Sequence, residues 1–412
     1  MTPQNIELKV EHKDLFSFAL EQSGVPLVSY VTICNHDSSP LEGAILEVAL
    51  YPDLGEAVYI NIPRLHGGDE HKIEVIDIRL PPGRLATTLE SERIVLECSV
   101  KQGDETLAKY KKEVTLLAYN DFNLSNLYFY LELLACFVTP NHPVIMQVLK
   151  QVREVLKTNT KDNSLSGYQT GSPEKVYKMT KALYETFKEL GISYINPPAS
   201  FDNYQKIRFA DQVLQDQMGT CLDLSVLACS CLEQIGLHPL LIIVKGHAFI
   251  GVWLQEEKLN NGLIINNILQ LINYCKSQAL LVFDSSSYAT YPQPSFEEAI
   301  DKALSYLNNT PLIGAVDIIN CRNHHKPYKP LPIRMKAVEN PELEYEEITS
   351  LAKQILKQAA LTQKNGEVEP FTPEKPKEKL PDSVEKRFQK WKASLLDLSA
   401  RNRLLNLANL DV

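Results

Sequence analysis

The spacing of apolar residues changes near residue 119, and this change constrains the fold more than any other feature of the sequence. Before it, short runs alternate between apolar and polar residues and are separated by clusters of Pro, Gly, Asp and Ser. A period of two predicts strands with one buried face, and the clusters predict turns between them. The predicted strands are 25–33, 44–51, 57–62, 72–80, 93–100 and 106–117.

Residues 1–119 are therefore predicted to form a separate β domain. About six or seven short strands at this spacing are typical of an immunoglobulin-like β-sandwich. No pattern in this region indicates catalysis, so we expect a docking or spacer module. His36, His66 and His71 are scattered among the predicted turns, and we expect them to be solvated rather than metal ligands.

Residues 120–335 are predicted to form a second domain, in which helices precede strands. Apolar residues recur there at three- and four-residue intervals, which predicts helices over 124–137, 143–156 and 173–190 and from about residue 221. Strands are predicted at 240–245, 247–254 and 279–284, with a helical insertion within 260–277. This order indicates an α+β fold.

Three segments of this second domain place a cysteine, a histidine and an acid where a nucleophilic triad needs them. GTCLD (219–223) puts Cys221 in the first turn of a helix, GHAF (246–249) puts His247 on a strand, and LVFD (281–284) ends a strand with Asp284. A helix N-terminus favours the thiolate, an imidazole carries the proton, and a carboxylate orients the imidazole. The alternative is that each is an ordinary core or turn residue. The charge of Asp223 would partly oppose thiolate formation.

Acyl transfer also requires hydrogen-bond donors for the oxyanion, and the backbone N–H of Cys221 is one candidate. Gln215, six residues before the cysteine, and Gln205 are candidates for the second donor, with Gln217 as a competitor. An ordinary surface role is the alternative for each glutamine. Asp317 and Arg322 could support the site or simply form an ion pair, and the structural role is the one we predict.

Composition and charge limit which binding partners and which cellular compartment we expect for this chain. The net charge of −9 provides no overall attraction to nucleic acid or to an anionic membrane. The N-terminus lacks the basic and apolar regions of a signal peptide, and the apolar stretch 240–254 is interrupted by Lys245 and His247. Eight cysteines without a CxxC pair indicate reduced thiols in a cytoplasm. We expect no cofactor and no metal site, the adjacent His324 and His325 included.

The residues around the predicted triad resemble the bacterial transglutaminase-like superfamily. The resemblance is carried by GTCLD at a helix start, by Gly236 after that helix, and by the strands that bear His247 and Asp284. It implies a papain-like core with a Cys-His-Asp triad, as in proteases, transglutaminases and peptide glycanases. The superfamily also contains members that have lost activity.

A more specific resemblance is to the N-terminal region of large bacterial helicase-related proteins associated with antiphage defence. It is carried by QKIR (205–208), CLDL (221–224), GLHP (236–239), GHAFIGVWL (246–254) and FEEA (296–299). It implies a transglutaminase-like domain upstream of a superfamily-1 helicase, although no Walker A motif occurs in these 412 residues.

The C-terminal part changes character again. Residues 336–380 are predicted to contain one amphipathic helix, at 342–360, and a charged, proline-rich linker. Trp391 and LLDLSARNRLLN (395–406) resemble the domain that precedes the helicase in the same large proteins. Residues 381–412 are therefore expected to be the truncated start of a following helical domain.

Together these features predict a cysteine-dependent hydrolase that cleaves peptide or isopeptide bonds in a bacterial, cytoplasmic defence protein. Its expected partners are a protein or peptide substrate and the downstream helicase domain, with no membrane and no nucleic acid bound by this fragment. The alternative is a catalytically silent transglutaminase-like module that recognises a phage or cellular protein or serves as a scaffold.

Overall fold

The computed structural model describes residues 5–52, 54–74, 76–81, 83–124, 130–197, 204–256 and 262–332. The chain divides into two units, residues 1–360 and 361–412, and all described residues belong to the first. The predicted helix at 342–360, the linker within 336–380 and the helical segment 381–412 lie outside the described residues. The domain limits at 119 and 335 stay predictions.

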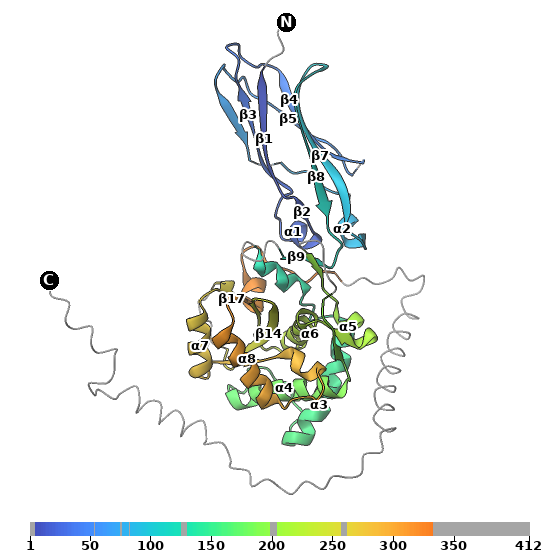
Figure 1. The fold of residues 1–412 in the computed structure, drawn as a ribbon, viewed down its shortest axis with the longest axis vertical. Helices are drawn as coiled ribbons and strands as arrows, with labels where there is room; N and C mark the ends of the chain where they lie inside the picture. Colours follow the sequence, from blue (N-terminus) through green and yellow to red (C-terminus); the bar gives the residue numbers. More distant parts are fainter. Residues whose placement is uncertain are drawn as a thin grey trace, which may run out of the picture. The chain divides into compact units, whose positions relative to one another are not determined.

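Two sheets form the N-terminal part of the chain (Figure 1). The first is antiparallel, with strand order β1 (Ile6–His12), β3 (Val28–Asn35), β6 (Glu70–Ile73). The second has the order β2 (Leu15–Phe16), β8 (Glu105–Leu116), β7 (Glu92–Gln102), β4 (Ala44–Tyr51), β5 (Val58–Asn61). The β2–β8 pair is parallel, and the other neighbours are antiparallel. Two short helices, α1 (Phe18–Gln22) and α2 (Arg84–Thr87), lie between strands in the sequence.

Alternating side chains of both sheets meet in one apolar core. Val31 and Ile33 of β3 are fully buried in the same cluster as Leu46 and Val48 of β4. This one-sided burial is the physical reason that a period-two pattern located these strands.

Two details of the N-terminal prediction differ from the structure. Strand β1 is absent from the predicted strands although its sequence, IELKVEH, also alternates. The strand predicted at 72–80 is wrong beyond Ile73, because β6 covers only Glu70–Ile73, and His71 therefore lies in a strand rather than in a loop.

Helices and short strand pairs precede the main sheet of the second part of the chain. The helices are α3 (Pro143–Thr160), α4 (Pro173–Glu189), α5 (Ala210–Asp216) and α6 (Cys221–Gln234). The short pairs join β9 (Asp121–Asn123) to β11 (Tyr204–Lys206) and β10 (Ser193–Tyr194) to β12 (Met218–Gly219). The helix predicted at 124–137 is instead a 3₁₀ helix, η2 (Leu131–Phe137), over its described C-terminal part.

The main sheet is antiparallel, and helices cover both of its faces (Figure 1). Its strand order is β15 (Ile264–Ile265), β17 (Leu312–Asp317), β13 (Pro239–Val244), β14 (His247–Trp253), β16 (Leu280–Phe283). Helix α6 packs on β13 and β14, whereas α7 (Ile268–Lys276) and α8 (Phe296–Asn309) pack on β16. Leu241 and Ile243 of β13 belong to one apolar cluster, while Leu240 and Ile242 belong to another. Successive residues therefore serve opposite faces, and the α+β fold class is confirmed.

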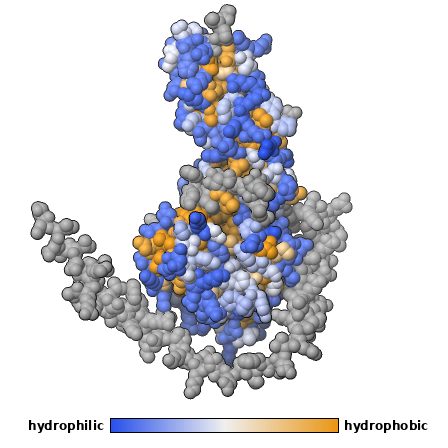
Figure 2. Space-filling view, viewed as in Figure 1, coloured by the Kyte–Doolittle hydropathy of each residue, from blue (hydrophilic) through white to orange (hydrophobic). Residues whose placement is uncertain are grey.

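The surface and the length of the helices bear on possible membrane contact. Among the described residues, no helix is both long enough and apolar enough to span a bilayer. Apolar colour gathers over α7 on the face drawn in Figure 2, where Leu269 is 66% exposed.

Arg322 lies on α9 (Ile318–Asn323), the last described helix. Its side chain binds α9 to the C-terminal end of α6. Its guanidinium donates hydrogen bonds to both carboxylate oxygens of Glu233, at 2.9 and 3.0 Å. It also donates to the backbone oxygens of Ala135, Val138 and Tyr328. Asp317 instead accepts a bond from the indole of Trp253 at 3.0 Å. Arg322 and Asp317 therefore have separate partners, and both have structural contacts.

We expect Arg322→Met to lower the free energy of unfolding by about 3–5 kcal/mol, because it leaves the Glu233 carboxylate without its cation in a nearly closed site and removes a donor from three carbonyls. The side chains of Arg322 and Glu233 are only 14% and 11% exposed. Arg153→Met is the matched control, since Arg153 pairs with Glu154 in solvent, and its cost should stay below about 1 kcal/mol. Urea unfolding measures both variants; equal midpoints would contradict a structural role for Arg322.

Candidate active site

Cys221 is the first residue of α6, and its position is fixed by a capping box. The Thr220 hydroxyl accepts a hydrogen bond from the backbone N–H of Asp223, and the Asp223 carboxylate accepts one from the N–H of Thr220 at 2.9 Å. The first turn of a helix carries partial positive charge and free N–H groups. Cys221 therefore lies beside the free N–H groups of the first turn of α6.

The negative charge of Asp223, which was expected to oppose a thiolate, has its own counter-ion. Arg208 donates its backbone N–H to one carboxylate oxygen at 2.8 Å and its guanidinium to the other at 3.1 Å. The Asp223 side chain is fully buried. Arg208 thus provides the positive charge that pairs with the capping acid beside Cys221.

The structure brings together the three residues predicted as a triad. His247 begins β14 and Asp284 directly follows β16, and these two strands are neighbours in the main sheet. The His247 Nε2 atom lies 2.8 Å from Asp284 Oδ1. The imidazole also interacts with the thiol of Cys221, and this interaction helps to raise the pKa of His247. Because Nε2 faces the acid, Nδ1 is the nitrogen left for the sulfur.

The surroundings of His247 favour its protonated form. Burial alone would lower the pKa of this imidazole, but hydrogen bonds and charge interactions with Asp284 and Cys221 outweigh burial and raise the pKa to about 9. The ring also packs on Tyr306 of α8 at a centroid distance of 4.4 Å. Protonated His247 therefore stabilises the fold fully below about pH 6.5, and this contribution is lost as the pH rises through about 9.

The Asp284 carboxylate is surrounded by donors at the start of η3 (Ser285–Ala289). The hydroxyls of Ser286 and Ser287 each donate at 2.8 Å, and the Lys302 ammonium of α8 lies 2.6 Å from Oδ2. Burial alone would raise the pKa of Asp284, but His247 and Lys302 outweigh it and hold this pKa well below its usual range. The acid therefore stays ionised.

Two side chains at this site were not predicted from the sequence. Lys302 contacts Asp284, and Tyr194 of β10 interacts with the thiol of Cys221. Burial and the neighbouring sulfur raise the pKa of Tyr194 to about 12. No local spacing links either residue to the triad; the β10–β12 pairing, which sets Tyr194 opposite Gly219, brings the tyrosine there.

The three glutamines considered as oxyanion donors lie in different environments. Gln205 of β11 donates its side-chain amide to the Thr220 hydroxyl at 3.3 Å, beside the start of α6. Gln215 is exposed on α5, and Gln217 ends that helix with a positive φ of 51°. The position of Gln205 is therefore the one adjacent to the cysteine, and its role as a donor stays a prediction.

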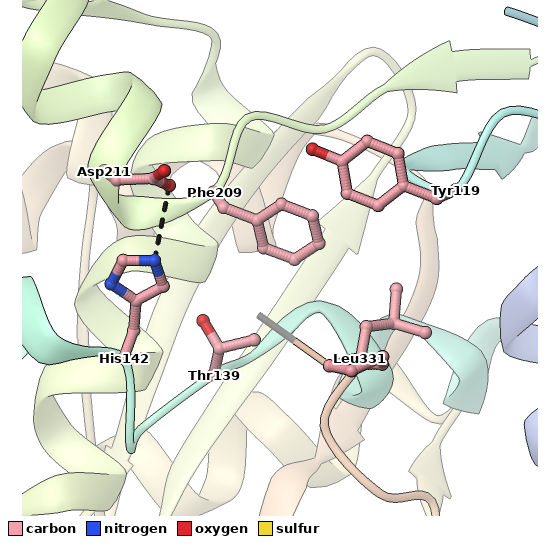
Figure 3. A pocket seen from close by; sticks show the side chains of 7 residues that line it. Tyr119, Thr139, His142, Phe209, Asp211 and Leu331 are labelled. Atoms are coloured by element: carbon pink, nitrogen blue, oxygen red, sulfur yellow. Dashed lines mark ion pairs between the residues drawn. The ribbon is translucent and has the colours of Figure 1, made fainter. Parts of the chain in front are cut away.

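The cavity drawn in Figure 3 lies apart from these residues. It is lined by Tyr119, Thr139, His142, Phe209, Asp211, Leu331 and Pro332. His142 and Asp211 form an ion pair across it, with Nε2 and Oδ1 3.4 Å apart. Its volume of about 20 Å³ is room for roughly one water molecule rather than for a substrate.

Comparisons with known proteins add no functional information. No protein-family model matches this chain, and no curated protein matches it significantly. Among solved structures, a family 76 glycoside hydrolase from a bovine Bacteroides thetaiotaomicron strain aligns with a TM-score of 0.18 and 9% identity, over 87% of this chain and 78% of that chain. A similarity this low supports no statement about fold or activity.

We expect Lys302→Met to raise the pKa of His247 above its value of about 9, by roughly 0.5 to 1. Without the lysine, the full charge of Asp284 acts on the imidazolium. Lys181→Met is the control, because Lys181 has similar exposure and pairs with Glu297 of the same helix, α8. NMR titration of labelled histidine measures both. A lower pKa in the Lys302 variant would contradict this electrostatic account.

Proposed function

We propose that residues 120–335 form a transglutaminase-like cysteine hydrolase domain whose nucleophile is Cys221. The observation that carries the proposal is the convergence of three side chains: His247 Nε2 lies 2.8 Å from Asp284 Oδ1, and the thiol of Cys221, at the start of α6, interacts with the same imidazole. Nucleophile, base and orienting acid occur in this geometry on unrelated folds, and their arrangement rather than their sequence spacing defines the chemistry.

The proposed reaction begins with attack of the Cys221 thiolate on the carbonyl carbon of a peptide or isopeptide bond. The backbone N–H of Cys221 and the amide of Gln205 would stabilise the resulting oxyanion. Protonated His247 then gives its proton to the leaving amine as the C–N bond breaks, which leaves a thioester. In the second step, His247 takes a proton from water, the hydroxide attacks the thioester, and a carboxylic acid and the free cysteine are released.

The supporting residues each have a distinct part in this reaction. Asp284 keeps the imidazole oriented so that Nδ1 faces the sulfur, and Lys302 moderates the charge of that acid. Arg208 neutralises Asp223 beside the nucleophile. Cys221 is only 9% exposed and Tyr194 interacts with its thiol, so an acyl group that reaches the sulfur must fit beside the tyrosine.

The wider context is proposed from sequence resemblance. It places this domain, with an immunoglobulin-like N-terminal sandwich, in a cytoplasmic bacterial defence protein with a downstream helicase. The enclosed sulfur favours one alternative, a catalytically silent module that recognises or scaffolds another protein. The reactivity of Cys221 separates the two functions, because a silent module has no need of an activated thiol.

We expect Cys221 to be the fastest of the eight cysteines to react with iodoacetamide at about pH 6.5, where ordinary thiols are mostly protonated. All eight are free thiols, and peptide mapping by mass spectrometry distinguishes them. Cys275 is the internal control. It is more exposed than Cys221, but burial raises its pKa to about 12.

His247→Ala should slow alkylation of Cys221 at least about tenfold and leave the rate at Cys275 unchanged. If Cys275 reacts first in the unmodified protein, or if the His247 variant reacts at the original rate, Cys221 is a core cysteine and the hydrolase proposal fails.

A further inference from the structure

The outer face of the first sheet brings four metal-binding side chains into one row. Glu7 of β1 is directly opposite Cys34 of β3, and Cys34 is directly opposite Glu70 of β6. His36 follows the end of β3, two residues beyond Cys34. Side chains directly opposite each other on adjacent strands project from the same face, as do residues two apart in an extended chain.

The donor atoms of this row are already close to one another. One oxygen of Glu7, the sulfur of Cys34 and one ring nitrogen of His36 all lie within 4.8 Å of one another. Glu7 Oε2 is 2.9 Å from His36 Nε2, and the Cys34 sulfur is 3.9 Å from Glu70 Oε2. Bonds of about 2.0–2.3 Å to a tetrahedral Zn²⁺ ion require neighbouring donors roughly 3.3–3.8 Å apart. Small side-chain shifts therefore suffice for Glu7, Cys34 and His36, whereas Glu70 approaches the group through Cys34 and must turn toward the other two.

We propose that this row is a metal site, in which Glu7, Cys34, His36 and Glu70 bind a divalent ion of the zinc type. One thiolate, one imidazole and two carboxylates form a mixed S, N and O set that suits Zn²⁺, whereas Mg²⁺ and Ca²⁺ prefer oxygen alone. Binding forms a metal–sulfur bond, and the thiol proton of Cys34 passes to solvent. Lys9, whose ammonium lies 3.7 Å from Glu7 Oε2, loses that contact.

The backbone around His36 is held in place without the metal. The Asn35 side-chain amide donates to the carbonyls of Ser39 and Leu65 at 2.9 and 3.0 Å, and its oxygen accepts from the N–H of Asp37. Gly67 packs so closely that a Cβ atom there would lie 2.2 Å from the Asp37 carbonyl. A rigid frame of this kind lowers the conformational cost of gathering ligands.

The proposed ligands also differ in solvent exposure in a way that suits a bound ion. Cys34 is 5% exposed, so a thiolate there is shielded, while Glu7 and His36 are each about half exposed and leave a path for the metal. Sequence spacing gives no indication of this juxtaposition, because the pairing of Cys34 with two acids depends on strand register.

The test is titration of the full chain carrying Cys221→Ala with Co²⁺, followed by Zn²⁺, so that the thiol of the candidate active site cannot contribute. We expect one Co²⁺ per chain, a thiolate-to-cobalt charge-transfer absorption, and its loss when Zn²⁺ displaces cobalt. Cys34→Ser should abolish the absorption. His36→Ala and Glu70→Gln should each weaken binding more than roughly tenfold.

His66→Ala is the matched control, because His66 is also exposed in the N-terminal part and should not alter binding. Circular dichroism of each variant checks its fold, and the exposed Glu70→Gln keeps the test valid if Cys34→Ser unfolds. No charge-transfer absorption, an absorption that persists in a folded Cys34→Ser chain, or equal effects of His36→Ala and His66→Ala would overturn the proposal.

Discussion

A carboxylate without solvent contact must be stabilised entirely by the protein around it, and Asp284 is such a group. The positive side chains of His247 and Lys302 pair with it, and two serine hydroxyls donate hydrogen bonds to it. These partners come from β14, α8 and η3, so one side chain connects three elements at the end of the main sheet. The orientation of the imidazole and the docking of α8 consequently depend on the same buried charge.

Local sequence patterns located much of this architecture. The apolar runs of β13, β14 and β16 are buried on both faces, and α3, α4 and α6 repeat apolar residues at helical spacing, so each can be identified from its own segment. The order of Cys221, His247 and Asp284 likewise indicated which residues would meet. β17 was missed, because Gly314 interrupts its short apolar run.

The contacts that modify the charge environment of the candidate triad could not be predicted from the sequence, for a physical reason. Lys302, Tyr194 and Arg208 reach the site from α8, from a two-residue strand and from the segment before α5. Nothing in the sequence of a lysine or arginine specifies which of many acids it will contact, because that choice follows from tertiary packing. The same applies to the row of Glu7, Cys34 and Glu70, which exists only through the register of three strands.

The contact between Arg322 and Glu233 has a mechanical consequence. Glu233 lies near the last turn of α6 and Cys221 is its first residue, so about 18 Å of continuous helix separates them. Tension applied at residue 332 would be borne first by the hydrogen bond from the Leu331 N–H to the Cys136 carbonyl and then by the Arg322–Glu233 pair, from which it would pass along the axis of α6. Cys221 thus lies at the N-terminal end of a rigid helix whose C-terminal end is held by Arg322.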